Sequence, residues 1–114
     1  MSDQYISTRV NSALLPRFLG KSVRLVCRPA KFSGSTVTVV ASDGGEVTIM
    51  LTPECTQMTS DSYWEVLGSV VNATSVRIHQ AIKMGPDLDM KLVDDTIKLI
   101  HDPRFFTKMF MPED

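Results

Sequence analysis

Alternating apolar and polar residues run through the middle of the chain and predict five short β-strands. In the first, Val23, Leu25 and Cys27 share one face, with the two-residue period of a half-buried strand. Four further segments, around residues 37–41, 47–51, 64–70 and 76–82, repeat this pattern. The residues expected on the inner face are Val23, Leu25, Val37, Val39, Val47, Ile49, Trp64, Val66, Val70, Val76 and Ile78.

Turn and bulge residues divide these segments. Ser33-Gly34-Ser35 follows the first strand, and Ser42-Asp43-Gly44-Gly45 after the second is a strong hairpin signal. Gly68 indicates a bend within the fourth strand, and Gln80 interrupts the alternation of the fifth in the manner of a bulge. Short twisted strands manage their edges best by closing into a barrel. The pattern therefore predicts a mainly β chain with a five-stranded OB-fold barrel; an open meander covered by a helix is the alternative.

The residues before the first strand predict an arm and a short helix. Residues 1–10 are expected to form a polar arm. Asn11 is a suitable cap for a helical turn through Phe18, and Gly20 suits the C-terminal end of that turn. Pro16 removes a backbone donor, so we expect the helix to be short or irregular.

A longer helix is predicted after the last strand. Asp87 follows Gly85-Pro86 and can cap the helix, and Pro103 should end it near Asp102. On a helical wheel the apolar residues form two stripes instead of the single stripe of a core-facing helix. One stripe holds Leu88, Leu92 and Leu99; the other holds Val93, Ile97 and Ile100, with Met90 at its edge; Thr96 lies between them, and Lys91, Asp94, Asp95, Lys98 and His101 fill the polar side.

Two apolar stripes need two packing surfaces, and the chain has one barrel to offer. The tail adds an apolar patch that a small monomer rarely exposes to water, namely Phe105, Phe106, Met109, Phe110 and Met111. We interpret residues 87–114 as a helix and tail that dock onto a partner, attached to an arm and barrel in residues 1–86 within one structural domain. The alternative is a helix enclosed by its own domain, with the tail folded back.

Charge is distributed unevenly, although the net charge is only −1. The first 31 residues carry Arg9, Arg17, Lys21, Arg24, Arg28 and Lys31 against Asp3 alone, and no Lys or Arg occurs from Phe32 to Val76. A basic N-terminal third can contact nucleic acid or an acidic partner, although a solvated face has the same composition. The length of 114 residues fits one globular domain.

No pattern in the sequence predicts an enzyme, a metal site or a cofactor. The histidines, His79 and His101, and the cysteines, Cys27 and Cys55, lack zinc-ligand spacing, and no phosphate-binding loop or nucleophile motif occurs. Cys27 is expected to be a small buried hydrophobe. We also expect neither a membrane-spanning helix nor a signal peptide.

Direct binding of single-stranded DNA is a competing hypothesis. OB domains that hold single strands use aromatic side chains and cations, on a face centred on their second and third strands. Residues 36–51, which form those strands here, contain no aromatic residue, Lys or Arg. The remaining candidates are the rim cations Arg24, Arg28 and Lys31, which could each contact a phosphate or simply be solvated.

Four segments, in order along the chain, resemble the smallest subunit of replication protein A. They are Arg9-Val10-Asn11 with Leu15 and Phe18-Leu19-Gly20-Lys21, then Ser42-Asp43-Gly44-Gly45-Glu46-Val47, then Tyr63-Trp64-Glu65-Val66-Leu67-Gly68-Ser69-Val70, and finally Ile97-Lys98-Leu99-Ile100-His101-Asp102 with Pro103 and Phe105. Together they span nearly the whole chain, and Trp64 in the third segment favours a fungal form. Pro103-Arg104 directly after Asp102 departs from the family pattern and leaves the path of the tail open.

The resemblance implies a nuclear OB-fold subunit whose C-terminal helix joins one helix each from a middle and a large subunit. The resulting heterotrimer binds single-stranded DNA in DNA replication, repair and recombination. Because residues 36–51 lack aromatic residues and cations, we expect this chain to bind little DNA of its own, and we expect no cofactor. The partner-binding residues are then expected to be Leu88, Leu92, Val93, Thr96, Ile97, Leu99, Ile100, Phe105 and Phe106. Two alternatives stay open: the small OB-fold subunit of a telomere-capping trimer, and an OB domain that contacts DNA directly.

Overall fold

The alternating segments form the strands that the sequence predicts, in a computed structural model that describes residues 7–53 and 58–102. The strands are β2 (Ser22–Ser33), β3 (Thr36–Ala41), β4 (Glu46–Met50), β5 (Tyr63–Asn72) and β6 (Ser75–Gly85). Every residue assigned to the inner face, from Val23 to Ile78, is buried. This burial fixes the register, because a slip of one residue would turn the whole apolar set outward.

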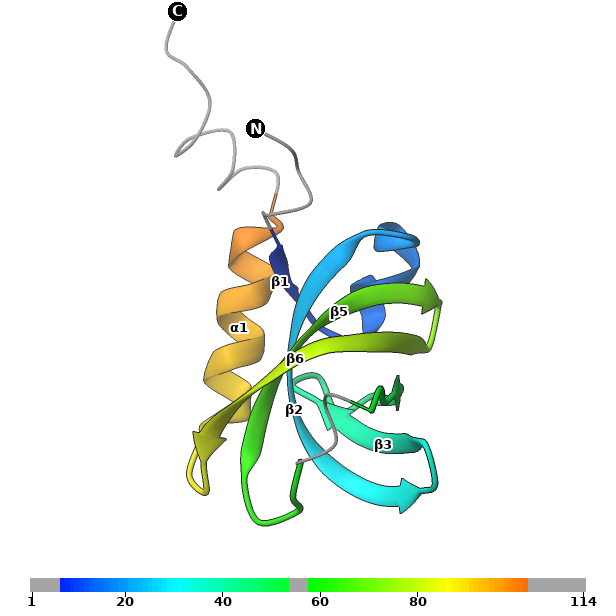
Figure 1. The fold of residues 1–114 in the computed structure, drawn as a ribbon. Coiled ribbons are helices and arrows are strands. Elements are labelled where there is room, and N and C mark those ends of the chain that lie inside the picture. The colour runs from blue at the N-terminus through cyan, green and yellow to red at the C-terminus, as the bar shows by residue number, and fades with distance from the viewer. Residues whose placement is uncertain (1–6, 54–57, 103–114) are drawn as a thin grey trace, which may run out of the picture.

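The five strands close into a ring. The sheet order is β1-β2-β3-β4-β6-β5, and β2 pairs with β5 as well as β3, which joins the two ends (Figure 1). One part of β2, residues 22–27, pairs with β5, and a second part, residues 27–33, pairs with β3. The predicted five-stranded OB-fold barrel with a C-terminal helix is therefore confirmed, and the open meander is excluded.

The N-terminal region joins the sheet, contrary to the prediction of a polar arm through residue 10. Thr8–Val10 form β1, which pairs in parallel with β2 at residues 23–25. Val10 is fully buried, but three residues are too few for an alternating pattern to be recognised in the sequence. The predicted cap at Asn11 is confirmed, since its side chain accepts a hydrogen bond from the Leu14 backbone at the start of the 3₁₀-helix η2 (Ser12–Phe18).

The C-terminal helix, α1 (Met90–Ile100), runs along the outside of the ring beside β1 (Figure 1). Its cap is Asp89, whose side chain accepts a hydrogen bond from the Leu92 backbone at 3.0 Å. The prediction of Asp87 as the cap is therefore wrong by two residues. Either aspartate has the right chemistry; the chain first turns at Gly85, which has a φ of 92°, and only then reaches the start of the helix.

Both sequence signals for irregularity in β5 and β6 are confirmed. Leu67 pairs with Gln80 and Gly68 pairs with Ile78, so His79 is the extra residue of a bulge. Gly68 is required by close approach of the two backbones. A Cβ at this position would collide with the carbonyl oxygen of Arg77 and lie only 2.7 Å from Cγ1 of Val76.

Replacing Gly68 should therefore weaken closure of the ring. We expect Gly68→Ala to lower the free energy of unfolding by roughly 1–3 kcal/mol, the usual cost of overpacking, in a urea titration followed by tryptophan fluorescence. Val71→Ala, at an exposed position on the same strand, is the control and should change it by about 0.5 kcal/mol or less. Equal stability of the Gly68→Ala and wild-type chains would show that β6 can move away without loss.

Candidate functional site

A buried carboxylate fixes α1 to the ring. Asp94 is only 6% exposed, and its Oδ1 accepts hydrogen bonds from Nδ2 of Asn11 at 2.9 Å and from Oγ of Ser42 at 3.2 Å. Its Oδ2 lies 3.0 Å from Nζ of Lys98. Burial acts to raise the pKa of Asp94, but the hydrogen bonds from Asn11, Lys98 and Ser42 outweigh it and hold the pKa below its ordinary value.

The assignment of Asp94 to the polar side of the helix is therefore wrong. Asp94 forms an ion pair with Lys98 one helical turn later, and Lys91 forms one with Asp95, at 3.1 Å on the exposed side. Nothing in the sequence connects Asp94 with Asn11, which lies 83 positions earlier. The sequence identifies Asn11 only as a helix cap. In the structure its side-chain oxygen caps η2 and its amide nitrogen donates a hydrogen bond to Asp94.

Two further side chains, those of Ile97 and His101, hold the inner face of α1 against the rest of the domain. Ile97 is fully buried. At the end of the helix, Nε2 of His101 donates to the carbonyl oxygen of Arg9 at 3.0 Å, and the ring of His101 meets that of Phe18 edge to face with 5.7 Å between centroids. Val26, which alternates with Leu25 and Cys27 in β2, is also fully buried although it lies outside the core cluster of the barrel.

The opposite side of α1 carries an apolar stripe that the ring does not cover. Leu92, Leu99 and Ile100 are 61%, 51% and 37% exposed, and Thr96 is exposed between them, with its hydroxyl donating to the Leu92 carbonyl oxygen. We call these four residues the outer stripe. Ile100 thus departs from the stripe predicted for it, while Val93 is half-buried and Ile97 faces the ring. Phe105 and Phe106 lie outside the described residues, and Leu88 is half-buried.

The surface of β3 and β4 lacks the groups that hold single-stranded nucleic acid in OB domains. The residues between the buried positions of these strands are Thr36, Thr38, Val40, Glu46, Thr48 and Met50. None is aromatic or cationic. Trp64 is no stacking platform either, since it is buried in the core as predicted and its Nε1 donates to the carbonyl oxygen of Thr59 at 3.0 Å.

Of the three rim cations, Arg24 neutralises a buried acid. Glu65 is 5% exposed, and its Oε2 lies 2.7 Å from Nη2 of Arg9 while its Oε1 lies 3.6 Å from Nη1 of Arg24. Nε of Arg24 also donates to Oγ of Ser7 at 3.0 Å. Arg24 therefore links β2 to β5 and to Ser7, the residue before β1, and a phosphate would have to compete with Glu65 for it.

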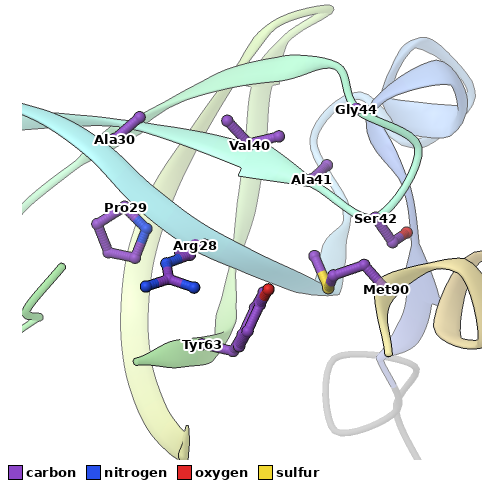
Figure 2. Close-up of a pocket in the computed structure, with 9 residues that line it drawn as sticks. All are labelled: Arg28, Pro29, Ala30, Val40, Ala41, Ser42, Gly44, Tyr63 and Met90. Carbon is purple, nitrogen blue, oxygen red and sulfur yellow. The ribbon is translucent and has the colours of Figure 1, made fainter. Parts of the chain in front are cut away.

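Arg28 is held against an aromatic ring beside a hollow of about 400 Å³. Its guanidinium carbon lies 5.0 Å from the centroid of the Tyr63 ring, a cation–π distance. In Figure 2, Tyr63 lies between Arg28 and Met90, which begins α1. The rest of the lining is small or apolar: Pro29, Ala30, Val40, Ala41, Ser42 and Gly44. Lys31 is exposed and forms no ion pair in the described part of the chain.

The described residues hold no constellation suited to catalysis. Burial raises the pKa of Cys27 to about 12, so its thiol stays protonated and unreactive at neutral pH. No group of three or more His, Cys, Asp or Glu among residues 7–53 and 58–102 could hold a metal ion. Within the same ranges, no helix is long and apolar enough to cross a membrane.

Both a family model and a solved structure match this chain over most of its length. A family model described as Replication factor A protein 3 matches residues 1–106. A chain in the structure of U. maydis Replication protein A bound to ssDNA is 29% identical, with a TM-score of 0.79 over 93% of this chain and 96% of that chain. No curated protein sequence gives a significant match.

Telomere proteins share the fold at much lower identity. A chain of the S. pombe Stn1-ten1 complex has a TM-score of 0.65 and 7% identity, over 81% of this chain and 89% of that chain. The telomere capping protein Ten1 from Saccharomyces pombe gives the same TM-score and identity, over 81% of this chain and 94% of that chain. At 7% identity this likeness shows a common fold and nothing further.

Removing the buried carboxylate should loosen α1. We expect Asp94→Ala to lower the free energy of unfolding by about 1–3 kcal/mol, because Asn11 and Ser42 lose a charged acceptor, as measured by urea titration at pH 7. Asp95→Ala, in the exposed ion pair one position away, should cost about 0–1 kcal/mol.

The same substitution predicts a dependence on pH. Because the folded-state pKa of Asp94 is lowered, its contribution is complete above the unfolded pKa of about 4 and is lost as pH falls through the folded value. The stability difference between wild type and Asp94→Ala should therefore shrink between pH 5 and strongly acidic solution. A difference that stays constant with pH would mean that Asp94 acts through packing alone.

Proposed function

The chain belongs to the Replication factor A protein 3 family, and from this premise we propose that it is the small structural subunit of a nuclear replication protein A heterotrimer. That assembly binds single-stranded DNA in DNA replication, repair and recombination. The similarity to a chain of U. maydis Replication protein A bound to ssDNA supports the proposal. The family is not an enzyme family, in agreement with the prediction from the sequence.

The observation that carries the proposal is the outer stripe of α1. A helix of this length is marginal alone in water and depends on packing, and the ring covers only the side with Asp94 and Ile97. Burying a fully exposed Leu or Ile contributes about 1.5–3 kcal/mol. Leu92, Leu99 and Ile100 are 61%, 51% and 37% exposed, so covering them would contribute part of that amount for each. We propose that helices of the middle and large subunits cover them in a three-helix bundle.

The partner-binding residues in this proposal are a subset of those expected from the sequence. The outer stripe and Leu88 face the partner helices, and Phe105 and Phe106 extend the contact along the tail. Val93 and Ile97 instead hold α1 against the ring. The proposal keeps residues 87–114 as the docking element and residues 1–86 as the body that positions it.

The subunit itself should contribute little to DNA affinity through the face that OB domains use most. The outer residues of β3 and β4 include Glu46 and no cation, and carboxylates repel phosphates. Arg24 and Arg28 are engaged with Glu65 and Tyr63. The telomere-capping alternative has only a shared fold to support it.

One substitution on each side of α1 separates docking from folding. Leu92→Glu should leave the melting temperature nearly unchanged, because the side chain stays in water, yet abolish co-purification with the two larger subunits by burying an unpaired charge. Ile97→Glu should unfold or strongly destabilise the chain itself, for the same reason within its own core. Co-expression pull-downs and thermal melts measure both.

The matched control for Leu92→Glu is Phe32→Glu. Phe32 is also a large apolar residue, 49% exposed, and it lies in β2 next to the β2–β3 turn. In Figure 1 this turn is far from α1. It should affect neither folding nor co-purification. Normal assembly of the Leu92→Glu chain would sink the docking role of the outer stripe.

The isolated chain should bind single-stranded DNA weakly. We expect no sub-micromolar affinity for a fluorescein-labelled oligothymidylate at about 0.1 M salt, where surface charges are largely screened beyond 10 Å. Tight binding that is lost on Tyr63→Ala, in a chain shown to remain folded, would instead favour direct DNA binding at the Arg28–Tyr63 hollow.

A further inference from the structure

Ion pairing divides the cations of this chain into two groups. Arg9 and Arg24 neutralise Glu65, while Lys91 and Lys98 pair with carboxylates along α1. By contrast, five cations are exposed and form no ion pair or cation–π contact within residues 7–53 and 58–102: Arg17, Lys21, Lys31, Arg77 and Lys83. Their positive charge is therefore available to a ligand.

Strand pairing places the backbones of Lys21 and Arg77 at neighbouring register positions across β2, β5 and β6. The carbonyl oxygen of Lys21 accepts a hydrogen bond from the Val70 backbone at 3.0 Å, Ser22 pairs with Ser69, and Ser69 pairs with Arg77. Neighbouring strands lie about 4.8 Å apart, so Ser22, Ser69 and Arg77 form a row about 10 Å long across β2, β5 and β6. Their side chains point outward, because the residues that flank them in each strand are buried.

Hydroxyl groups and a hollow adjoin this row. Oγ of Ser69 lies 2.8 Å from Nε2 of His79. The hollow has a volume of about 510 Å³, and its polar lining residues are Ser7, Ser22, Arg24 and His79. We call Lys21, Ser22, Ser69 and Arg77, with this hollow, the β2–β5–β6 face.

Acidic residues are missing from the segments that build this face. Residues 12–22 and 66–82 contain no Asp or Glu, and the nearest carboxylate along β5, that of Glu65, is buried beneath Arg9 and Arg24. The outer residues of β3 and β4 have the opposite charge, because they include Glu46 and no cation. The face that can attract a polyanion is therefore formed by β2, β5 and β6. OB domains most often bind nucleic acid on the strands that correspond to β3 and β4 here.

We propose that the β2–β5–β6 face binds the sugar–phosphate backbone of single-stranded DNA, a proposal that rests on the function proposed above. Cationic and hydroxyl donors are the groups that contact phosphate oxygens in nucleic-acid complexes. The row of Ser22, Ser69 and Arg77 offers hydroxyl groups and a cation but no aromatic ring, and the imidazole of His79 beside it is engaged with Ser69. We therefore assign the contact to phosphates and not to bases. A few such contacts give weak binding by the chain alone and add to the affinity of an assembly that already holds the strand.

The first test uses the full chain by itself, labelled with ¹⁵N, in about 0.01 M salt, where the Debye length is about 30 Å. Oligothymidylate should shift the amide signals of residues 21–22, 69 and 77, and an abasic sugar–phosphate oligomer of equal length should shift the same signals. Shifts confined to β3 and β4, shifts that require the bases, or no shifts at all would overturn the proposal.

The second test uses the heterotrimer reconstituted with its two larger subunits. A Lys21→Gln, Arg77→Gln double variant should reduce the slope of log affinity against log salt by about 1.4, since each contact with a single strand contributes about 0.7. Lys83→Gln with Lys91→Gln removes the same charge from exposed positions elsewhere and should leave the slope unchanged.

The remaining outcomes separate this face from the proposed function. An equal loss in both double variants would reveal a net-charge effect and overturn the proposal. An unchanged slope with poorer co-purification of the larger subunits would make the face a protein contact instead. If the wild-type chain forms no heterotrimer, the proposed function fails, and the amide shifts of the single chain still decide whether this face binds the backbone.

Discussion

A buried carboxylate must be satisfied, and the placement of α1 depends on that requirement. An unpaired charge at the position of Asp94 would cost several kcal/mol. Its partners, Asn11 and Ser42, belong to the η2 cap and the β3–β4 loop, so the helix has to adopt the one rotation that brings the carboxylate to both. That rotation buries Ile97 and turns Leu92 and Leu99 into solvent. The exposed stripe is thus a consequence of the polar contact.

The same requirement distributes the positive charge. Glu65 is buried on the outer side of β5, and its carboxylate forms ion pairs with Arg9 and Arg24. Arg28 is likewise occupied by the ring of Tyr63. A third of the chain that looks uniformly basic in sequence is therefore divided in space: some of its cations stabilise the fold, and others, including Lys21, remain on the surface.

Ring closure separates the surfaces that result. β2 is long enough to pair with β1, β3 and β5, and Gly68 lets β6 approach β5 closely enough to complete the ring. The outer stripe belongs to α1, the β2–β5–β6 face to three strands of the ring, and the surface without cations to β3 and β4. A protein contact along α1 and a phosphate contact on the β2–β5–β6 face would therefore use different residues.

The sequence by itself determined the barrel and the existence of a helix with surplus apolar surface. Every residue that two-residue alternation assigned to the inner face, from Val23 to Ile78, is buried, because burial on one face of a strand follows directly from the period of the backbone. Gly68 and Gln80 also marked the irregular pairing of β5 and β6, because a missing side chain and a break in alternation are local signals.

Only the tertiary structure decided which way α1 faces and which cations are free. A helical wheel ranks residues by polarity, so it placed Asp94 with the solvent-facing residues; the contact with Asn11 spans 83 positions, and no local pattern encodes it. The strand at Thr8–Val10 and the pairing of Arg24 with Glu65 escaped the sequence for the same reason. Each depends on residues that become neighbours only after the ring has closed.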